Sequence, residues 1–336
     1  MADAPSAAPV TNRVPGPMSF AYIVEDGVAR EVDHDRAHEQ KRGRNSLLWV
    51  HLHGSDEFCD AWLASLPDIP HPVRSALTAT ETRPRCDAID DGALVNLRGL
   101  GDARMDSADP LVSIRMWLQR GRVVSVTRRA LSAIEPLRGD LSGGRVHDPG
   151  DLVAVLATEI STQLDSVIAE IGDKLDDTES ALSAERAFEM RRTTAKIRAQ
   201  AIGFRRFVAP ERIALRALAE LPASWIDDRD RVDLKDAADR FARMTEELEA
   251  IRERAALMHE QLTDLRAEQI EGRTLLLSMV ALIFLPLTFI TGLIGMNVEG
   301  IPYATEPWAF WAIVGFCVVT GGGVIAWFVR AHWLRR

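Results

Sequence analysis

Two uncharged runs near the C-terminus constrain the fold of this chain more than any other feature. Residues 275–295 and 308–329 contain no Asp, Glu, Lys or Arg. Each run is long enough for the ~20 apolar residues that a membrane-spanning helix needs. Because only a short segment joins them, we expect the two spans to form a helical hairpin that leaves both chain ends on the same side of the membrane.

The charges that flank the two spans predict their orientation. Arg273 precedes the first span, and a basic tail at residues 330–336 follows the second. The connecting loop has no Lys or Arg but carries Glu299 and Glu306. By the positive-inside tendency, both termini are expected in the cytoplasm and the loop outside. The expected divisions are a first span at 274–296, an external loop at 297–307 and a second span at 308–329.

The chain that precedes the spans is rich in Asp, Glu and Arg, which is typical of a soluble protein. Residues 1–18 lack the basic and apolar regions of a signal peptide and are expected to form a disordered tail. The formal net charge of −9 argues against nucleic-acid binding. The three cysteines are isolated, so neither a disulfide framework nor a zinc ribbon is indicated. The chain has no phosphate-binding loop, HExxH, GxSxG or dinucleotide fingerprint, and an enzyme is therefore disfavoured.

Residues 19–150 alternate short β-rich runs with short helical stretches, which is typical of an α/β domain with a mixed sheet. The strands are expected at residues 20–25, 47–53, 93–100, 111–118 and 122–127. Residues 151–273 are expected to form a helical hairpin of oppositely charged helices and then a long stalk helix, with Asp151 as the N-cap of the first. The stalk helix has no Pro from about Asp230 until Pro286, so it should continue into the first span.

The long helix carries two heptad stripes. The first is apolar and should pack against neighbouring helices; it consists of Phe241, Met244, Leu248, Ile251, Ala255, Met258, Leu262 and Leu265. The second, the membrane stripe, has small or hydroxyl-bearing members apart from one leucine: Thr274, Ser278, Ala281, Leu285, Thr288, Gly292 and Gly295. Small residues let helices pack closely, whereas hydroxyls suit a water-filled axis. The stripe alone leaves open whether it lines a pore or holds one helix against another.

Toward the N-terminus the membrane stripe continues in the same phase as an acidic face. Its acidic members are Glu246, Glu253, Glu260, Asp264 and Glu271. If several copies surround one axis, this face forms an acidic vestibule that concentrates cations. An ordinary solvated helix face is the alternative. Because a straight helix drifts ~20° per heptad, alignment of the two parts requires a left-handed supercoil.

One segment carries a specific resemblance to a known family. The triplet Gly295-Met296-Asn297, directly after the first span, resembles the GMN motif of the CorA family of divalent-cation transporters. The preceding FLPLTFITGLIG and the ending RAHWLRR are similar to that family. The segments TRPRCDAIDDGALVNLRGL and LVSIRMWLQRGRVVSVTRR, and the triplet IPY after the motif, resemble its zinc-transporting branch.

The resemblance implies a homopentameric funnel in the lipid of the bacterial inner membrane. The long helix and first span would line a central pore, and the second span would form an outer ring. Gly295, Met296 and Asn297 would form the selectivity filter, with the Asn297 amide hydrogen-bonded to the water shell of the ion. The pore-lining residues would be Thr274, Ser278, Ala281, Leu285 as a constriction, Thr288 and Gly292. Glu299 and Glu306 would attract cations to the external loop.

The function implied by the resemblance is zinc uptake, with no cofactor besides the transported divalent cation. Proton coupling stays open: the resemblance to the zinc branch implies it, whereas residues 275–296 contain no Asp, Glu or His to relay a proton. The alternative is a CorA-type channel for Mg²⁺, Co²⁺ or Ni²⁺. Met296 and Glu299 depart from the zinc branch, whereas Tyr303 after Pro302 departs from the magnesium-transporting relatives. A membrane-tethered scaffold is the alternative from another class.

Three histidines are candidates for direct zinc ligands. His51 and His53 alternate along an expected strand, so both side chains face the same way and would supply half of a zinc site. His259 lies beside Glu260 on the stalk helix. A structural or surface role is the alternative for each of the three.

Overall fold

The structure is a computed structural model that describes residues 18–39, 46–55, 57–80, 83–102, 109–183, 185–296 and 306–333. The chain divides into two compact units. Unit 1 comprises residues 1–181 and 191–259, and unit 2 comprises residues 182–190 and 260–336. The N-terminal tail expected at 1–18 lies almost wholly outside the described residues, as do the loop residues 297–305.

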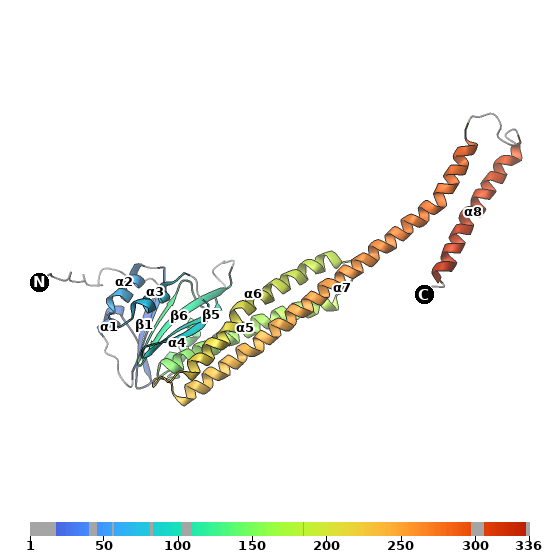
Figure 1. Ribbon diagram of the computed structural model, residues 1–336. Coiled ribbons are helices and arrows are strands. Elements are labelled where there is room, and N and C mark those ends of the chain that lie inside the picture. The colour runs from blue at the N-terminus through green and yellow to red at the C-terminus, as the bar shows by residue number, and fades with distance from the viewer. Residues whose placement is uncertain are drawn as a thin grey trace. The chain divides into compact units, whose positions relative to one another are not determined.

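Unit 1 is built on a mixed seven-stranded sheet in the order β2-β1-β3-β7-β6-β5-β4 (Figure 1). Its strands are β1 (Phe20–Glu25), β2 (Val28–Val32), β3 (Ser46–His53), β4 (Arg85–Ile89), β5 (Gly92–Leu100), β6 (Leu111–Gln119) and β7 (Arg122–Thr127). Only the β3–β7 pair is parallel among these strands, and the other neighbours are antiparallel. The five strands expected from the sequence are confirmed. The two edge strands β2 and β4 were not expected, because each has exposed side chains at most positions and lacks an apolar run.

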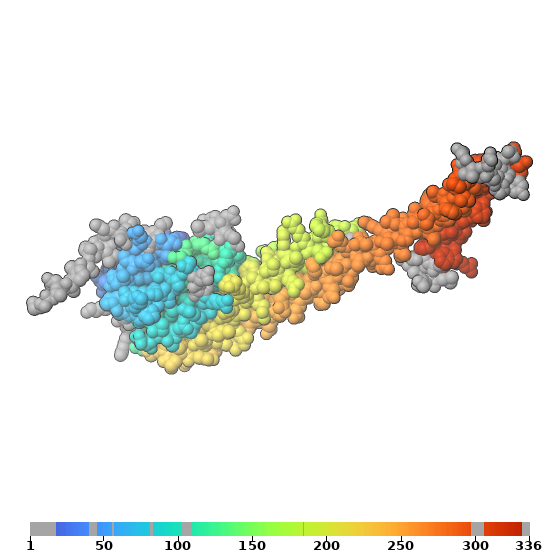
Figure 2. Space-filling model, turned by 45° about the horizontal axis from the view of Figure 1, so that its top comes forward, coloured from blue at the N-terminus to red at the C-terminus, as the bar shows by residue number. Residues whose placement is uncertain are grey.

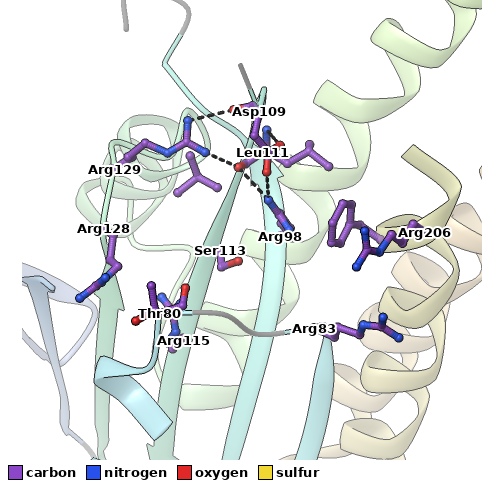
Figure 3. A pocket seen from close by; sticks show the side chains of 12 residues that line it. Thr80, Arg83, Arg98, Asp109, Leu111, Ser113, Arg115, Arg128, Arg129 and Arg206 are labelled. Carbon is purple, nitrogen blue, oxygen red and sulfur yellow. Dashed lines mark hydrogen bonds and ion pairs between the residues drawn. The ribbon is translucent and has the colours of Figure 1, made fainter. Parts of the chain in front are cut away.

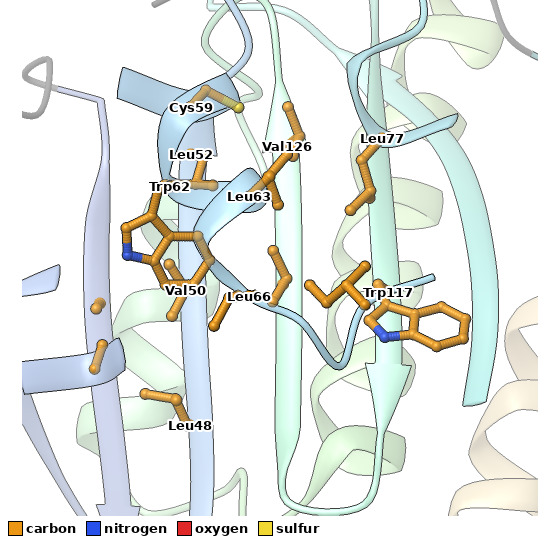
Figure 4. Close-up of a cluster of buried hydrophobic side chains, with 14 of the residues drawn as sticks. Leu48, Val50, Leu52, Cys59, Trp62, Leu63, Leu66, Leu77, Trp117 and Val126 are labelled. Carbon is orange, nitrogen blue, oxygen red and sulfur yellow. The ribbon is translucent and has the colours of Figure 1, made fainter. Parts of the chain in front are cut away.

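Short helices cover one face of the sheet. They are α1 (His34–Glu39), α2 (Glu57–Ser65) and α3 (His71–Thr78). Their apolar side chains pack on alternate residues of the strands, such as Leu48, Val50 and Leu52 of β3, around the buried rings of Trp62 and Trp117 (Figure 4). The alternation follows from the two-residue period of a strand, which places every second side chain on the same face.

Helices cover the other face of the sheet as well. The helix α4 (Ile134–Ser142) precedes α5 (Pro149–Ser180), and Ile160 of α5 packs so closely on β5 that a Cβ atom at Gly99 would lie 3.0 Å from its side chain. The N-cap of α5 is Asp148, whose side chain accepts a hydrogen bond from the Asp151 N–H. The prediction that Asp151 caps this helix is therefore wrong by one turn, because Pro149, which has no N–H to satisfy, occupies the first helical position.

Two further long helices follow, α6 (Ala187–Glu220) and α7 (Asp228–Ile294). Within unit 1 they pack beside α5, as Figures 1 and 2 show in green, yellow and orange. The apolar stripe of α7 is confirmed as a seam, because its members from Phe241 to Met258 are at most 3% exposed. Thr194 of α6 donates a hydrogen bond to Met258 Sδ at 3.2 Å, and Ile251 lies 3.7 Å from the Cβ position of Gly172 in α5.

Ion pairs connect α7 to both neighbouring helices in unit 1. Arg254 donates to Asp176 of α5 at 2.6 Å, and Arg205 of α6 pairs with Glu249 at 2.8 Å. Both pairs are largely exposed, so each contributes little to stability. The α7 helix is continuous to Ile294, which confirms the expectation that the stalk runs on into the first apolar span. The last helix, α8 (Pro307–Trp333), extends beyond the second expected span into the basic tail.

Three helices in the described part of the chain are long and apolar enough to cross a membrane by length and composition. They are α5, α7 and α8. Half of the apolar window of α5 is buried within the fold, whereas none of the windows of α7 and α8 is. Packing thus accounts for half of the apolar window of α5, and most of the exposed large apolar side chains in the described residues lie in the two expected spans.

Candidate functional site

The membrane stripe lies on the C-terminal part of α7, within unit 2. Two hydroxyl groups in this part of the helix bond to the preceding turn: Thr274 donates to the Ile270 carbonyl at 2.9 Å and Thr291 to the Leu287 carbonyl at 3.0 Å. Such bonds to the preceding turn allow Thr to occupy an apolar helix without an unsatisfied donor. These two hydroxyls are therefore compatible with either lipid or water around the helix.

One face of α7 is occupied by α8. Gly321 of α8 is buried, and a Cβ atom there would lie 3.8 Å from both Ile283 and Leu287 of α7. The half-buried residues of α7 in this region recur at helical spacing: Met279, Ile283, Leu287, Ile290 and Ile294. The sequence has this period of four and three, but every side of the run except the membrane stripe is apolar, so the seam could not be distinguished from residues that face lipid.

The membrane stripe points away from α8. All seven of its members, from Thr274 to Gly295, are exposed in the single chain. At about 100° per residue, the mean direction of the stripe lies about 190° from that of the side chains that contact α8. A helix that covers one face of α7 therefore leaves free the face that carries Ser278, Thr288 and Gly292.

Leu285 is the most exposed large side chain of the membrane stripe, at 76%. It lines an apolar groove of about 720 Å³ together with Leu282, Pro286, Thr288 and Phe289. Because Pro286 has no N–H, the carbonyl oxygen of Leu282 has no helical hydrogen bond from that position. The groove thus combines a bulky apolar side chain, that of Leu285, with a position where the helix lacks one backbone hydrogen bond.

The α7 helix ends where the three-residue motif begins. The Gly295 N–H donates to the Thr291 carbonyl at 2.8 Å, and a Cβ atom at Gly295 would lie 3.1 Å from that same oxygen. Met296 follows with its side chain half exposed. Asn297 and Glu299 lie outside the described residues, so the structure brings neither to a defined place. Glu306 is exposed, one residue before α8 begins.

The acidic residues that continue the stripe are exposed as well. Glu246 and Glu253 belong to unit 1, and Glu260, Asp264 and Glu271 belong to unit 2. Among these, Glu253 has a neighbouring cation, with Arg252 at 3.7 Å. Because the apolar seam of α7 is turned inward, the acidic side chains remain on a solvent-facing surface of the single chain.

The candidate histidine ligands occupy different surroundings. His51 is 3% exposed and stacks on Phe20, with Nδ1 2.8 Å from Ser125 Oγ and Nε2 3.2 Å from Thr127 Oγ1. Burial lowers the pKa of His51 to about 3, helped by repulsion from His53 and Arg138. His51 and His53 do share a face, since they pair with Ser125 and Thr127. Hydroxyls rather than a third metal ligand fill the space beside His51.

The other two histidines are also engaged. His53 Nε2 lies 3.0 Å from the Arg128 carbonyl oxygen, and His259 Nε2 lies 3.4 Å from a guanidinium nitrogen of Arg191. A guanidinium group can only donate, so the His259 ring nitrogen is the acceptor in this contact. None of the three histidines belongs to a group of metal-ligating side chains in the part of the chain that the structure describes.

One acidic group in the described residues has the spacing of a metal site, namely Asp148, Asp151 and Asp230. Hydrogen bonds within the chain explain its geometry. Asp148 caps α5, while Asp227 and Asp230 cap α7 reciprocally, each carboxylate accepting from the backbone N–H of the other at 2.8 Å. Burial, together with repulsion from the neighbouring carboxylates, raises the pKa of Asp230 to about 7. The three carboxyl groups therefore lie together because they cap, or adjoin the caps of, the N-termini of α5 and α7. The sequence did not predict this cluster, because the capping residues of the two helices are about 80 positions apart.

Comparison with known proteins gives consistent matches over most of the chain. Residues 44–331 match the family described as CorA-like Mg²⁺ transporter protein. The zinc transport protein ZntB of Enterobacter sp. (strain 638) is 33% identical over 317 residues, which cover 94% of this chain and 95% of that protein. The ZntB protein of Klebsiella pneumoniae subsp. pneumoniae is 31% identical over 318 residues, with the same coverage.

Solved structures with the same fold are also found. The full-length CmaX protein matches with a TM-score of 0.77 and 28% identity, covering 96% of this chain and all of that chain. The CorA magnesium transporter from Methanocaldococcus jannaschii matches with a TM-score of 0.76 and 19% identity, covering 94% of this chain and 99% of that one. The ZntB cytoplasmic domain from Vibrio parahaemolyticus matches with a TM-score of 0.64 and 20% identity, covering 74% and 98%.

Proposed function

Because this chain belongs to the family of CorA-like Mg²⁺ transporter proteins, we propose that it carries zinc ions into the bacterial cell across the inner membrane. The resemblance inferred from the GMN motif is thereby confirmed at the level of the family. The family is one of metal-ion transporters, which is not an enzyme class. Zinc is preferred over Mg²⁺, Co²⁺ or Ni²⁺ because relatives that are 31–33% identical over most of their length are named zinc transport proteins.

The proposed pathway is a central pore formed by five copies of the chain. In this arrangement α7 lies inside and α8 outside. The observation that carries it is the opposition of the two faces of α7: the α8 seam lies on one side and the membrane stripe on the other. Hydroxyl groups that faced lipid would find no polar partner there. On the axis of a pore, the same hydroxyl groups would contact the water shell of the ion.

The proposed selectivity filter follows directly after the end of α7. Five Gly295 backbones and five Asn297 amides would ring the outer entrance and hydrogen-bond the water shell of the ion. A neutral amide suits this task, because a fixed carboxylate would bind a dication too tightly to release it. Glu299 and Glu306 would raise the local cation concentration at the entrance.

The interior of the proposed pore has two further parts. Five Leu285 side chains would form an apolar constriction that closes when water leaves it. On the cytoplasmic side, the five copies of the acidic face from Glu246 to Glu271 would line a vestibule that concentrates cations. Ions that bridge carboxylates of adjacent copies would stabilise one state of the pore, and their loss would release it.

The proposed topology places both termini in the cytoplasm and the loop at 297–307 outside. The absence of Lys and Arg from that loop supports this orientation. Passive entry is then favourable, since a dication gains ~4.6 kcal/mol per 100 mV of inside-negative potential. Because no titratable carboxylate or imidazole lies in residues 275–296, proton coupling would have to use the loop glutamates or the acidic face.

The test is zinc uptake into proteoliposomes that contain the purified protein, with and without a pH gradient and with Mg²⁺ as a competitor. Zinc uptake that Mg²⁺ does not inhibit is the expected result, and its response to the pH gradient decides between coupled and passive transport. Asn297→Ala should abolish uptake while the pentamer persists in size-exclusion chromatography. Uptake blocked by Mg²⁺ and indifferent to pH would instead assign the protein to the magnesium channels. Undiminished uptake by Asn297→Ala would overturn the proposed filter.

A further inference from the structure

A strongly basic pocket lies in unit 1, far along the chain from the proposed pore residues (Figure 3). It has a volume of about 590 Å³, within the range of ~300–1,000 Å³ that is usual for small-molecule sites. Six arginines line it: Arg83, Arg98, Arg115, Arg128, Arg129 and Arg206. Thr80 and Ser113 add hydroxyl groups, and the described lining contains one carboxylate, that of Asp109.

The pocket is formed on the sheet face that α1 to α3 cover. Arg115 of β6 pairs with Asn96 of β5, two residues from the Leu94–Trp117 pair that contributes to the buried cluster beneath those helices. Two residues along a strand return to the same face, so the guanidinium of Arg115 points to that side. The chain contributes further arginines after β7 and from α6, which are labelled around the opening in Figure 3.

The positive charge of the pocket is only partly balanced within the described residues. Arg98 forms an ion pair with Asp109 and stacks over the ring of Phe207 at 3.8 Å. Arg129 donates to two backbone carbonyl oxygens, those of Asp109 at 2.9 Å and Leu111 at 2.6 Å. Carbonyl groups carry no net charge, so these bonds fix the position of Arg129 without neutralising it.

Arg115 provides the strongest evidence that the pocket binds an anion. It is 2% exposed, donates one hydrogen bond to the Thr80 carbonyl at 3.3 Å, and its buried Nε has no partner. Burial lowers the pKa of Arg115, and repulsion from Arg128 and Arg98 lowers it further. Buried charges in proteins are ordinarily paired, because removing an unpaired charge from water is costly. A buried guanidinium whose charged neighbours are other arginines therefore indicates that an anion completes the site.

A nearby buried carboxyl group does not supply that charge. Glu211 of α6 accepts a hydrogen bond from the backbone N–H of Arg98 at 2.6 Å and is fully buried. Burial raises the pKa of Glu211 well above its ordinary value, which favours the neutral acid. The excess of arginine charge thus persists beside it.

We propose that this pocket binds a small anion that carries two or more phosphate groups, such as inorganic pyrophosphate or a nucleoside diphosphate. Guanidinium groups match phosphate oxygens with two parallel hydrogen bonds, and hydroxyls can donate to the remaining oxygens. Four of the arginines form no ion pair with a carboxylate in the described part of the chain, and together they call for several negative charges in one ligand: Arg115, Arg128, Arg129 and Arg206. The site repels metal cations, so it is separate from the transported ion and does not depend on the proposed transport function.

The test is isothermal titration calorimetry of the full-length protein in detergent with sodium pyrophosphate, at fixed ionic strength and without divalent cations. A parallel titration with ADP, and competition between the two ligands, distinguishes inorganic from nucleotide phosphate. We expect saturable binding of at least one of them. In the doubly substituted Arg128→Gln/Arg206→Gln protein, whose altered side chains are exposed, the affinity should fall at least tenfold, about 1.4 kcal/mol.

The matched control is Arg30→Gln/Arg36→Gln, which removes the same charge from exposed positions of β2 and α1 outside the pocket. It should bind within about twofold of the unaltered protein, since distant surface charges are screened. A second variant, Arg115→Met, should lose binding without a lower thermal midpoint, because an apolar side chain replaces an unpaired buried charge. Equal loss in the control variant, or no heat of binding for either ligand at ~1 mM, the weak end of specific affinity, would overturn the proposal.

Discussion

At the scale of single residues, the proposed pore predicts different effects on zinc uptake for the same substitution at two threonines of the hairpin. Thr288 of α7 lies on the membrane stripe beside Leu285, whereas Thr320 of α8 is half buried on the side of α8 that packs toward α7. Thr288→Val would extend the apolar constriction by one ring of five side chains, and dewetting of a longer apolar segment opposes ion passage. We expect zinc uptake into proteoliposomes to fall about tenfold, equivalent to ~1.4 kcal/mol. Thr320→Val, which loses the same hydroxyl, should retain most of the uptake; equal loss in both variants would remove Thr288 from the axis.

A second residue-scale prediction concerns Asp230, which is 1% exposed and whose pKa burial raises to about 7. Since the unfolded value is 3.8, the folded protein binds more protons than the unfolded one between about pH 4 and 7. This group therefore makes the protein less stable as pH rises through that window. Asp230→Asn keeps an oxygen that can accept from the Asp227 N–H but has no proton to lose. The thermal midpoint should fall less from pH 5 to pH 8 in Asp230→Asn than in the unaltered protein. An equal fall in both proteins would show that loss of the Asp230 proton does not cause the change in stability.

The basic pocket shows which residues sequence reasoning cannot assemble. Its arginines come from the segment before β4, from β5 and β6, from the segment after β7 and from α6, and they span more than 100 positions. No helical or strand period relates them, and each arginine alone is an ordinary surface charge. By contrast, the membrane stripe lies on one helix, so its common face follows from spacing alone. Its assignment to a pore still depends on the assembly and remains a proposal.

At the scale of secondary-structure elements, the long helices and central strands were predictable and the edges were not. The seam from Phe241 to Met258 repeats every three or four residues, and burial at each position follows from that period. The strands β2 and β4 have polar sequences, VAREV and RCDAI, because they pair on one side only and face solvent. Long-range pairing rather than local propensity places them in the sheet.

The junction between the N-termini of α5 and α7 gives an element-scale prediction. A Cβ atom at Gly150 would lie 2.1 Å from Asp230 Oδ2, so Gly150→Ala must displace the carboxyl group that caps α7. Such overpacking costs about 1–3 kcal/mol, and the thermal midpoint should fall. Gly172→Ala, in the same helix, meets its nearest atom at 3.7 Å and should raise the midpoint, because Ala favours helix by about 1 kcal/mol over Gly. A fall of equal size in both variants would show that the junction is not the cause.

At the scale of the whole molecule, the acidic face connects the stalk part of α7 with the proposed pore. The face is exposed in the single chain, so its function depends on the neighbouring copies. Five copies would place many carboxylates around one axis, where mutual repulsion favours the binding of divalent cations between them. Occupied sites would hold the copies together, and empty sites would let them separate. The internal metal concentration would then control the inward flux.

The corresponding variant neutralises four acidic residues of that face together: Glu246→Gln, Glu253→Gln, Glu260→Gln and Asp264→Asn. Inward zinc flux of the unaltered protein should decrease as zinc is added inside the proteoliposome. In the variant, the same decrease should require at least ~10-fold more internal zinc, because a state that binds fewer ions is shifted less by them. The matched control neutralises four exposed acids outside that face: Asp173→Asn and Asp177→Asn of α5, and Glu247→Gln and Glu268→Gln of α7. If both variants respond to internal zinc as the unaltered protein does, the acidic face is a solvated surface and the control of flux lies in another part of the molecule.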